Sequence, residues 1–182
     1  MNEEMEQQEQ TNPSIWKSTL SYGLLTGFGL VLVTVIFYLA GSLGNRWINF
    51  VGYLILVGGI IVGIKSFRDD QNAGVISYGR ALGAGTLVGL FAAIISSAFS
   101  VLLFHVIDPA AMQQMLVEAE LNMIEQMPQM TDAQLEDALQ ISRTMMKPFF
   151  MFFFGVLSYT FIAFLFSLII AAFLKRNPTE EF

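Results

Sequence analysis

Four long apolar segments without a charged residue constrain this 182-residue chain more than any other feature. They cover about residues 20–40, 47–64, 81–107 and 148–174. A helix rises about 1.5 Å per residue, so roughly 20 residues cross the hydrocarbon core of a bilayer. Because lipid offers no hydrogen-bond partners, the backbone groups of each segment must be satisfied within a helix. The sequence therefore predicts an all-α membrane protein with four transmembrane helices.

The composition excludes several functional classes. Only 13% of the residues are charged, about half the share found in ordinary soluble domains. The net charge of −6 opposes binding to nucleic acid, whose phosphates are also negative. The chain has no cysteine and therefore no disulfide, thiol nucleophile or zinc–thiolate site. It shows no catalytic triad pattern, metal-ligand spacing or phosphate-binding loop, and no ionisable residue at the middle of a span. We therefore expect neither an enzyme nor a proton-coupled carrier, and neither a cofactor nor a metal ion.

The basic residues outside the spans predict how the chain is oriented. An acidic tail at residues 1–16, expected to be disordered, precedes a membrane domain at 17–176, and a short tail at 177–182 follows it. Four spans place both termini and the middle connection on one side of the membrane. That side holds six of the nine basic residues: Lys17, Lys65, Arg68, Arg80, Lys175 and Arg176. Since positive charge favours the cytoplasmic side, we expect cytoplasmic termini and a periplasmic loop at 108–147.

The pattern of the loop 108–147 predicts two short helices. Asp108 followed by Pro109 is a favourable helix start, and Thr131 with Gln134 forms a capping-box pattern for a second helix. Apolar residues recur at intervals of three to four in both helices, while the loop carries seven acidic and two basic residues. We therefore expect an amphipathic helical hairpin between the third and fourth spans, lying on the membrane surface or on the end of the bundle.

Methionine is concentrated in the same loop, which holds seven of the ten in the chain. Thioethers bind Cu(I), and His105 lies just upstream, so a soft-metal site is one interpretation. Methionine also forms adaptable apolar surfaces that pack internally or dock another protein or a lipid. The spacing follows the helical period rather than a ligand cluster, which favours packing and leaves docking as the second interpretation.

Small residues recur at every fourth position of the third span and form the clearest pattern in the chain. They are Ala81, Gly85, Gly89, Ala93 and Ser97. Residues four apart lie along one ridge of a helix, and a ridge of small side chains lets another helix backbone approach closely in lipid. Two interpretations follow: packing against another span of the same chain, or the interface of a homodimer.

The connection between the second and third spans is expected to be anchored at the membrane surface by Lys65, Arg68, Tyr78 and Arg80. Two motifs lie in this connection: K-x-F-R-D at residues 65–69 and G-x-I-S-Y-G-R-A-L at residues 74–82. With the glycine-rich third span, the acidic helical loop and the fourth span that follow, the chain resembles the bacterial membrane family called domain of unknown function 4199 (DUF4199). The family has no established activity, cofactor or catalytic residue. The resemblance therefore implies a location, the bacterial inner membrane, and no function.

Two functions from different classes are compatible with these features. The lack of a catalytic or ion-coupling pattern, together with the packing ridge and the outer loop, favours a non-enzymatic scaffold or accessory subunit whose loop docks a partner or lipid. The expected partners are the lipid bilayer and a second copy of the chain or another membrane protein, but not nucleic acid. The alternative is a small oligomeric transporter or channel, in which polar residues of the third and fourth spans line a path: Ser96, Ser97, Ser100, Ser158 and Thr160.

Overall fold

The computed structural model describes residues 15–71 and 74–176, and in these ranges the chain is mainly helical. The helices are, in chain order, α2 (Ile15–Leu39), α3 (Trp47–Gln71), α4 (Tyr78–Leu102), the π-helix η1 (Leu103–Ile107), α5 (Pro109–Gln126), α6 (Asp132–Met145) and α7 (Pro148–Leu174). The predicted tails lie outside the described residues over 1–14 and 177–182. Ile15 and Trp16, expected in the tail, instead begin α2, because Lys17 marks the edge of the apolar segment and does not interrupt the helix.

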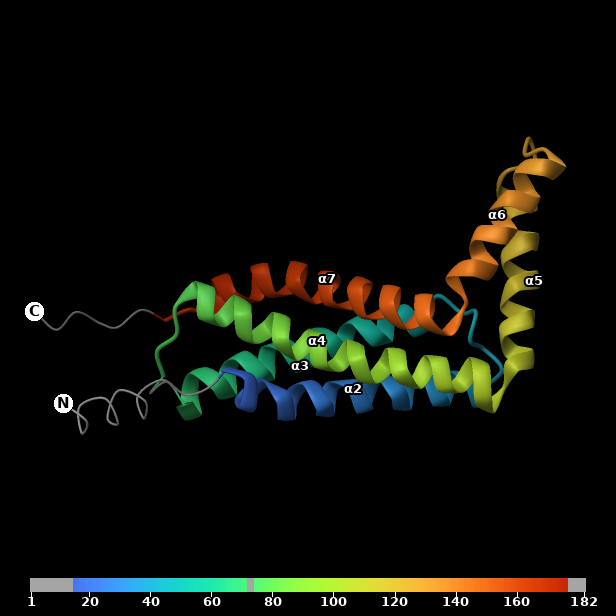
Figure 1. Ribbon diagram of the computed structural model, residues 1–182. Helices are drawn as coiled ribbons and strands as arrows, with labels where there is room; N and C mark the ends of the chain where they lie inside the picture. The colour runs from blue at the N-terminus through green and yellow to red at the C-terminus, as the bar shows by residue number, and fades with distance from the viewer. Residues whose placement is uncertain (1–14, 72–73, 177–182) are drawn as a thin grey trace, which may run out of the picture.

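Four of the helices, α2, α3, α4 and α7, are long and apolar enough to cross a membrane. They lie side by side in one elongated bundle (Figure 1). The start of α2, the α3–α4 connection and the end of α7 lie at one end of the bundle, here called the loop end. Helices α5 and α6 lie beyond the opposite end, here called the hairpin end. The predicted all-α membrane fold with four spanning helices is confirmed.

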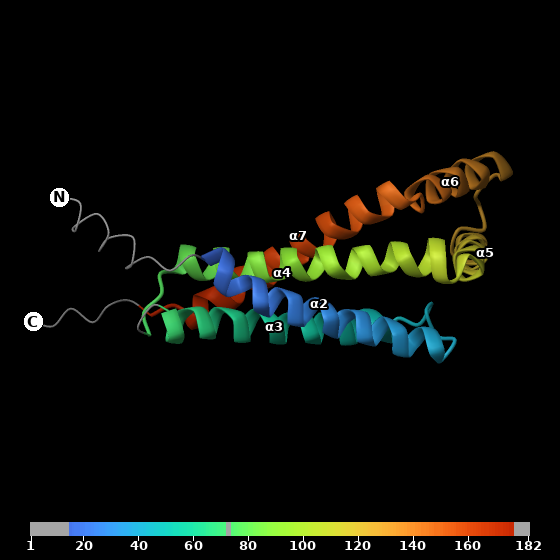
Figure 2. The same ribbon diagram turned by 60° about the horizontal axis from the view of Figure 1, so that its bottom comes forward.

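Helix α4 is the central element, because its contacts with α7 and α2 are the most extensive in the bundle and it also contacts α3. Helix α7 crosses the bundle at an angle, so that its end approaches α3 at the loop end while its start lies apart from α3 at the hairpin end (Figure 2). In the loop-end half, large side chains of α3 are almost completely buried against small residues of α4 and α7; they include Ile60, Ile64 and Phe67. The core is therefore densest near the loop end.

Helices α5 and α6 form the predicted hairpin, which turns away from the long axis of the bundle (Figure 1). At its base, a carboxylate oxygen of Asp108 accepts a hydrogen bond of 3.1 Å from the backbone N–H of Ala111 and caps α5. Tyr38 of α2 donates its hydroxyl proton to the other oxygen of Asp108 at 3.0 Å, which ties the hairpin to the bundle. Thr131 and Gln134 form both hydrogen bonds of a capping box at the start of α6. Both predicted helix starts are confirmed.

Helix α3 extends beyond the predicted second span, past Ile64 to Gln71. Lys65 and Arg68 therefore lie on α3, where a loop was expected, and Tyr78 and Arg80 lie in the first turn of α4. Charged residues end the apolar segment without ending the helix, because lysine and arginine are good helix formers once the chain has left the hydrocarbon. The chain reverses around Gly74, whose φ of +81° lies in the left-handed region that favours glycine.

Candidate functional site

The small-residue ridge predicted on α4 is buried, and its two glycines lie against α7. A Cβ atom built on Gly89 would collide with the Cβ of Ala163, and one built on Gly85 would collide with the hydroxyl of Ser167. The other ridge positions, Ala81, Ala93 and Ser97, are also buried. Helix α7 of the same chain therefore occupies the face that was also considered for a homodimer.

The matching face of α7 is a second row of small residues that the sequence pattern did not reveal. Gly155, Ala163, Ser167 and Ala171 are separated by four or eight residues, and the last three are fully buried. A Cβ atom on Gly155 would lie 2.6 Å from the hydroxyl oxygen of Ser97 on α4. The spacing of four or eight residues was a usable signal for this row. The many phenylalanines between these positions make the segment apolar on every side and obscure the row in the sequence. Two smooth ridges facing each other explain why α4 and α7 approach so closely.

The remaining glycines of the spans divide into packed and open positions. Gly23 and Gly27 of α2 face side chains of α4, and Gly59 of α3 faces a side chain of α2. By contrast, none of the described residues lies within 4 Å of a Cβ atom built on Gly79 or Gly83. Glycine in these spans therefore does not always mark a helix contact.

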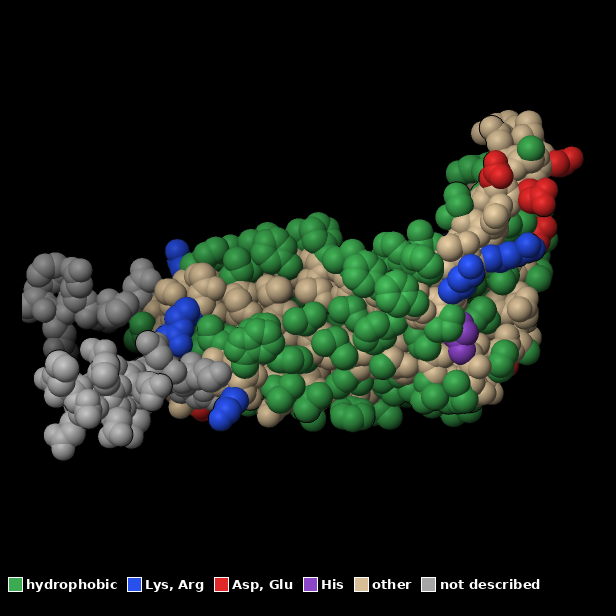
Figure 3. All heavy atoms as spheres, viewed as in Figure 1, with side chains coloured by type: hydrophobic (Ala, Val, Ile, Leu, Met, Phe, Trp, Pro, Cys, Tyr) green, Lys and Arg blue, Asp and Glu red, His purple; other side chains and the backbone are tan. Residues whose placement is uncertain are grey.

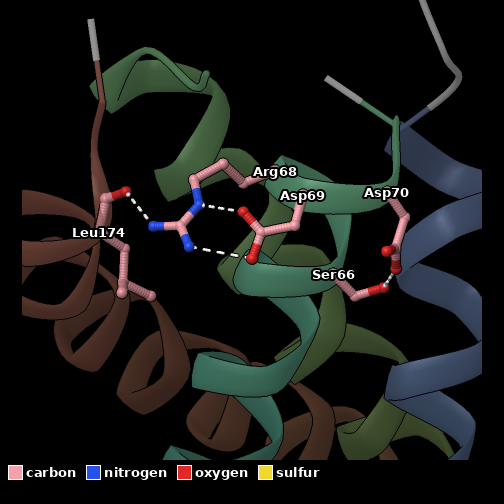
Figure 4. Close-up of polar contacts among 5 residues, drawn as sticks. All are labelled: Ser66, Arg68, Asp69, Asp70 and Leu174. Carbon is pink, nitrogen blue, oxygen red and sulfur yellow. Dashed lines mark hydrogen bonds and ion pairs between the residues drawn. The ribbon is translucent and has the colours of Figure 1, made fainter. Parts of the chain in front are cut away.

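Arg68 connects α3 to the end of α7 at the loop end (Figure 4). Its Nε and Nη2 atoms donate to the two carboxylate oxygens of Asp69 at 2.6 and 3.0 Å, and its Nη1 atom donates to the carbonyl of Leu174 at 3.3 Å. Arg68 is only 8% exposed, whereas the side chain of Asp69 is 48% exposed. The planar guanidinium group can donate two parallel hydrogen bonds to a carboxylate and a third to a backbone carbonyl, which is the arrangement found here.

A backbone link reinforces this connection. Ile76 and Arg176 exchange two N–H···O hydrogen bonds of 2.9 and 3.0 Å. The hydroxyl of Tyr78 donates to a backbone carbonyl of α7, that of Leu168, at 3.2 Å. We call the contacts of Arg68, Tyr78 and the Ile76–Arg176 pair the latch, because all of them hold the end of α7.

The two other predicted anchors are placed differently. The guanidinium carbon of Arg80 lies 5.3 Å from the ring centroid of Phe67, a cation–π contact between α4 and α3. Lys65 is exposed on α3. The structure therefore brings Arg68, Tyr78 and Arg80 into tertiary contacts and leaves Lys65 at the surface.

Two adjoining hollows lie at the hairpin end and share the lining residues Leu43 and Met115. The outer hollow, of about 390 Å³, lies between the end of α2, the α2–α3 connection and the start of α5. The carboxylates of Asp108 and Glu118 line it. A Cβ atom built on Gly44 would lie 2.5 Å from Oε2 of Glu118, so this carboxylate lies directly against the α2–α3 connection.

The inner hollow, of about 260 Å³, lies where all four spanning helices meet in the hairpin-end half of the bundle. Each helix contributes polar lining residues, which are Thr34, Asn49, Ser96, Ser97, Ser100 and Tyr159. The volume is close to the lower limit of about 300 Å³ for small-molecule pockets. This hollow is therefore the candidate ligand site within the spanning helices.

Only part of the predicted polar path lines the inner hollow. Ser96, Ser97 and Ser100 do so. Ser158 is exposed on α7, and the hydroxyl of Thr160 is buried without a hydrogen-bond partner among the described residues. The spacing within one helix could not identify the lining residues of α2, α3 and α7, because a junction of four helices is set by tertiary packing.

The methionines of the hairpin also divide into two groups. Met112 and Met115 pack with Tyr38 and Leu43 around the buried cluster at the base of the hairpin, whereas Met127 is exposed nearer the tip. Within residues 15–71 and 74–176, no group of three or more His, Cys, Asp or Glu side chains is arranged to hold a metal ion. Packing therefore accounts for the first group.

Helix α5 presents an exposed apolar row, here called the docking row, formed by Val117, Leu121 and Ile124. Ala111 and Met115 of the same helix pack against the end of the bundle. At about 100° per residue, the centre of the docking row lies roughly 130° around α5 from the centre of these two residues. The row therefore faces away from the bundle.

Acidic residues border the docking row on both sides, Glu120 on one and Glu118 and Glu125 on the other, by the same helical geometry. Figure 3 shows that acidic side chains of the hairpin gather at its tip and on the side away from the bundle. The row and its borders thus form an apolar stripe between negative charges.

Most of the chain matches one known protein family. The family described as Protein of unknown function (DUF4199) matches residues 21–176. The chain belongs to this family. No curated protein and no solved structure matches it. The DUF4199 region contains the α4–α7 contact, the latch, both hollows and the docking row. The predicted family is confirmed, and its description supplies no activity.

Proposed function

We propose that this DUF4199 protein is a non-enzymatic membrane scaffold or accessory subunit that docks a partner through α5. The docking row carries the proposal: its three large apolar side chains are 48–60% exposed on a face turned away from the bundle. With the four helices in a bilayer, that face is turned away from the hydrocarbon. Apolar rows exposed to water mark interaction sites, because burying them against a partner removes apolar area from water.

The borders of the docking row define the chemistry of the partner. Helix α5 contains three glutamates and no basic residue. An amphipathic helix with an apolar stripe bordered by Lys or Arg would match both the row and its charges. We therefore propose a basic amphipathic segment of another membrane or periplasmic protein as the occupant.

The proposal includes an orientation. Lys17, Lys65, Arg68 and Arg80 lie near the loop end, and an excess of basic residues favours the cytoplasmic side. The loop end then faces the cytoplasm, and the hairpin lies on the periplasmic side of the bacterial inner membrane. An acidic hairpin meets no positive-charge barrier to translocation.

Photo-crosslinking in native membranes tests the docking proposal. A photoreactive amino acid at Leu121, in the docking row, is expected to capture a discrete protein, and the captured peptide should carry an apolar stripe bordered by basic residues. The matched control is Gln126, which is exposed on the opposite side of α5 and should capture little. Replacing Glu118 and Glu125 together by lysine should reduce capture at Leu121 about tenfold, because the borders then repel a basic partner. Equal capture at both positions, or an acidic captured peptide, would contradict the proposal.

Transport is the second candidate, because the inner hollow has a polar lining drawn from all four spanning helices. The hollow lies in the hairpin-end half, whereas close-packed side chains of α3, α4 and α7 occupy the loop-end half. A solute path through one chain would therefore require α7 to move against its small-residue contacts with α4. This requirement favours docking over transport.

A further inference from the structure

The inner hollow presents hydrogen-bond acceptors that the protein leaves available. Thr34 donates its hydroxyl proton to the carbonyl of Leu30 at 3.0 Å, and Ser100 donates to that of Ser96 at 2.9 Å. Their oxygen lone pairs remain free to accept. Ser97 is only 5% exposed, and its hydroxyl forms no hydrogen bond with any described residue. Because this hydroxyl lines the hollow and has no partner there, a ligand with a donor group would be favoured.

The outer hollow presents negative charge. Asp108 already accepts hydrogen bonds from Tyr38 and from the backbone of Ala111. The carboxylate of Glu118 accepts none from the described residues. No Lys, Arg or His is among the described residues that line either hollow. The pair of hollows therefore favours a cation and disfavours an anion.

The two hollows also share an apolar boundary. Leu43 and Met115 line both of them, and Leu30, Val33 and Phe104 add apolar surface to the inner one. A chain of methylene groups would be buried favourably along this boundary, because burial removes apolar surface from water. The chemistry along the hollows is thus anionic, then apolar, then polar and uncharged.

We propose that the two hollows form one binding site for a linear amino alcohol. Its ammonium group pairs with Glu118 in the outer hollow, its methylene chain passes Leu43 and Met115, and its hydroxyl donates to Ser97 in the inner hollow. This site shares Glu118 with the border of the docking row, but it takes a different ligand and goes beyond the docking function. Ligand binding to this site is measured on purified protein without a docking partner. A failure of the ligand proposal and a failure of the docking proposal are therefore separate results.

Calorimetric titration of the full-length protein in lipid nanodiscs, at constant ionic strength, tests the site with aminopentanol as the probe. We expect saturable binding, and about tenfold weaker binding of pentylamine, which lacks the hydroxyl, and of pentanediol, which lacks the charge. Aminopentanoate, which replaces the hydroxyl by an anion, should not bind. Glu118→Gln should reduce the affinity for aminopentanol about tenfold, and Ser97→Ala should remove the preference for aminopentanol over pentylamine.

The matched control is Glu136→Gln, which removes an exposed carboxylate of α6 outside both hollows and outside the docking row. It should leave the affinity unchanged, and the thermal unfolding of each variant without ligand shows that its fold is intact. Absence of aminopentanol binding, equal affinity for aminopentanol and pentanediol, or an unchanged affinity in folded Glu118→Gln would overturn the proposal.

Discussion

Gly89→Leu is expected to destabilise the bundle by about 3 kcal/mol, the upper end of the usual range for overpacking. Gly89 lies against Ala163, and a single added Cβ atom would already collide there. The facing ridges of α4 and α7 can accept leucine only by separating, which loses contacts along both helices. Lipid does not compensate, because packing itself holds helices together in a bilayer. Thermal unfolding in detergent should show a midpoint lowered by about 6–12 °C.

Gly83→Leu is the matched control for this substitution. Gly83 lies on the same helix, but none of the described residues is within 4 Å of its built Cβ atom. Its effect should stay within about 0.5 kcal/mol, as for an ordinary surface substitution. If Gly89→Leu instead left the midpoint unchanged and converted a dimer to a monomer, the ridge would be an interface between copies, contrary to the contact with α7.

Arg68→Met is expected to loosen the latch and cost about 1–2 kcal/mol. The carbonyl of Leu174 loses its charged donor and Asp69 loses its ion pair, while methionine keeps much of the aliphatic packing. The expected loss of stability is small because Asp69 is half exposed and water replaces part of the lost interaction. Amide hydrogen exchange at Ile76 and Arg176 should become about tenfold faster, because these two N–H groups close the backbone link to the end of α7.

Lys65→Met provides the control for charge alone. Lys65 is exposed on α3, three residues before Arg68. Its replacement should leave exchange at Ile76 and Arg176 unchanged. Equal acceleration in both variants would attribute the effect to lost positive charge, and no acceleration in Arg68→Met would show that the latch does not hold α7.

The periodic features of this fold could be predicted because they depend on local sequence. The length of the apolar segments without charged residues identified the spans. The capping residues Asp108 and Thr131 identified where the two hairpin helices begin. The spacing of Gly85 and Gly89 identified a face suited to close packing. It could not identify the partner helix, because a small-residue ridge fits any helix with a complementary face.

The tertiary features could not be predicted from spacing. The inner hollow depends on the oblique course of α7, whose start lies apart from α3 at the hairpin end. Three different helices contribute the lining residues Asn49, Ser97 and Tyr159. The contact between Arg68 and Leu174 joins residues 106 positions apart. The docking row could not be predicted either, because the packing of Ala111 and Met115 on the bundle fixes which side of α5 is free.

Cysteine labelling with a membrane-impermeant reagent tests the docking proposal most directly, since the native chain has no cysteine. Leu121→Cys and Gln126→Cys should react at similar rates in liposomes of purified protein. In intact cells, Gln126→Cys should still react, whereas Leu121→Cys should react about tenfold more slowly because the partner covers the docking row. Ser77→Cys, at the loop end, should stay unlabelled until the cells are permeabilised. Labelling of Leu121→Cys at the rate of Gln126→Cys in cells, or its protection in liposomes where lipid alone is present, would contradict the account.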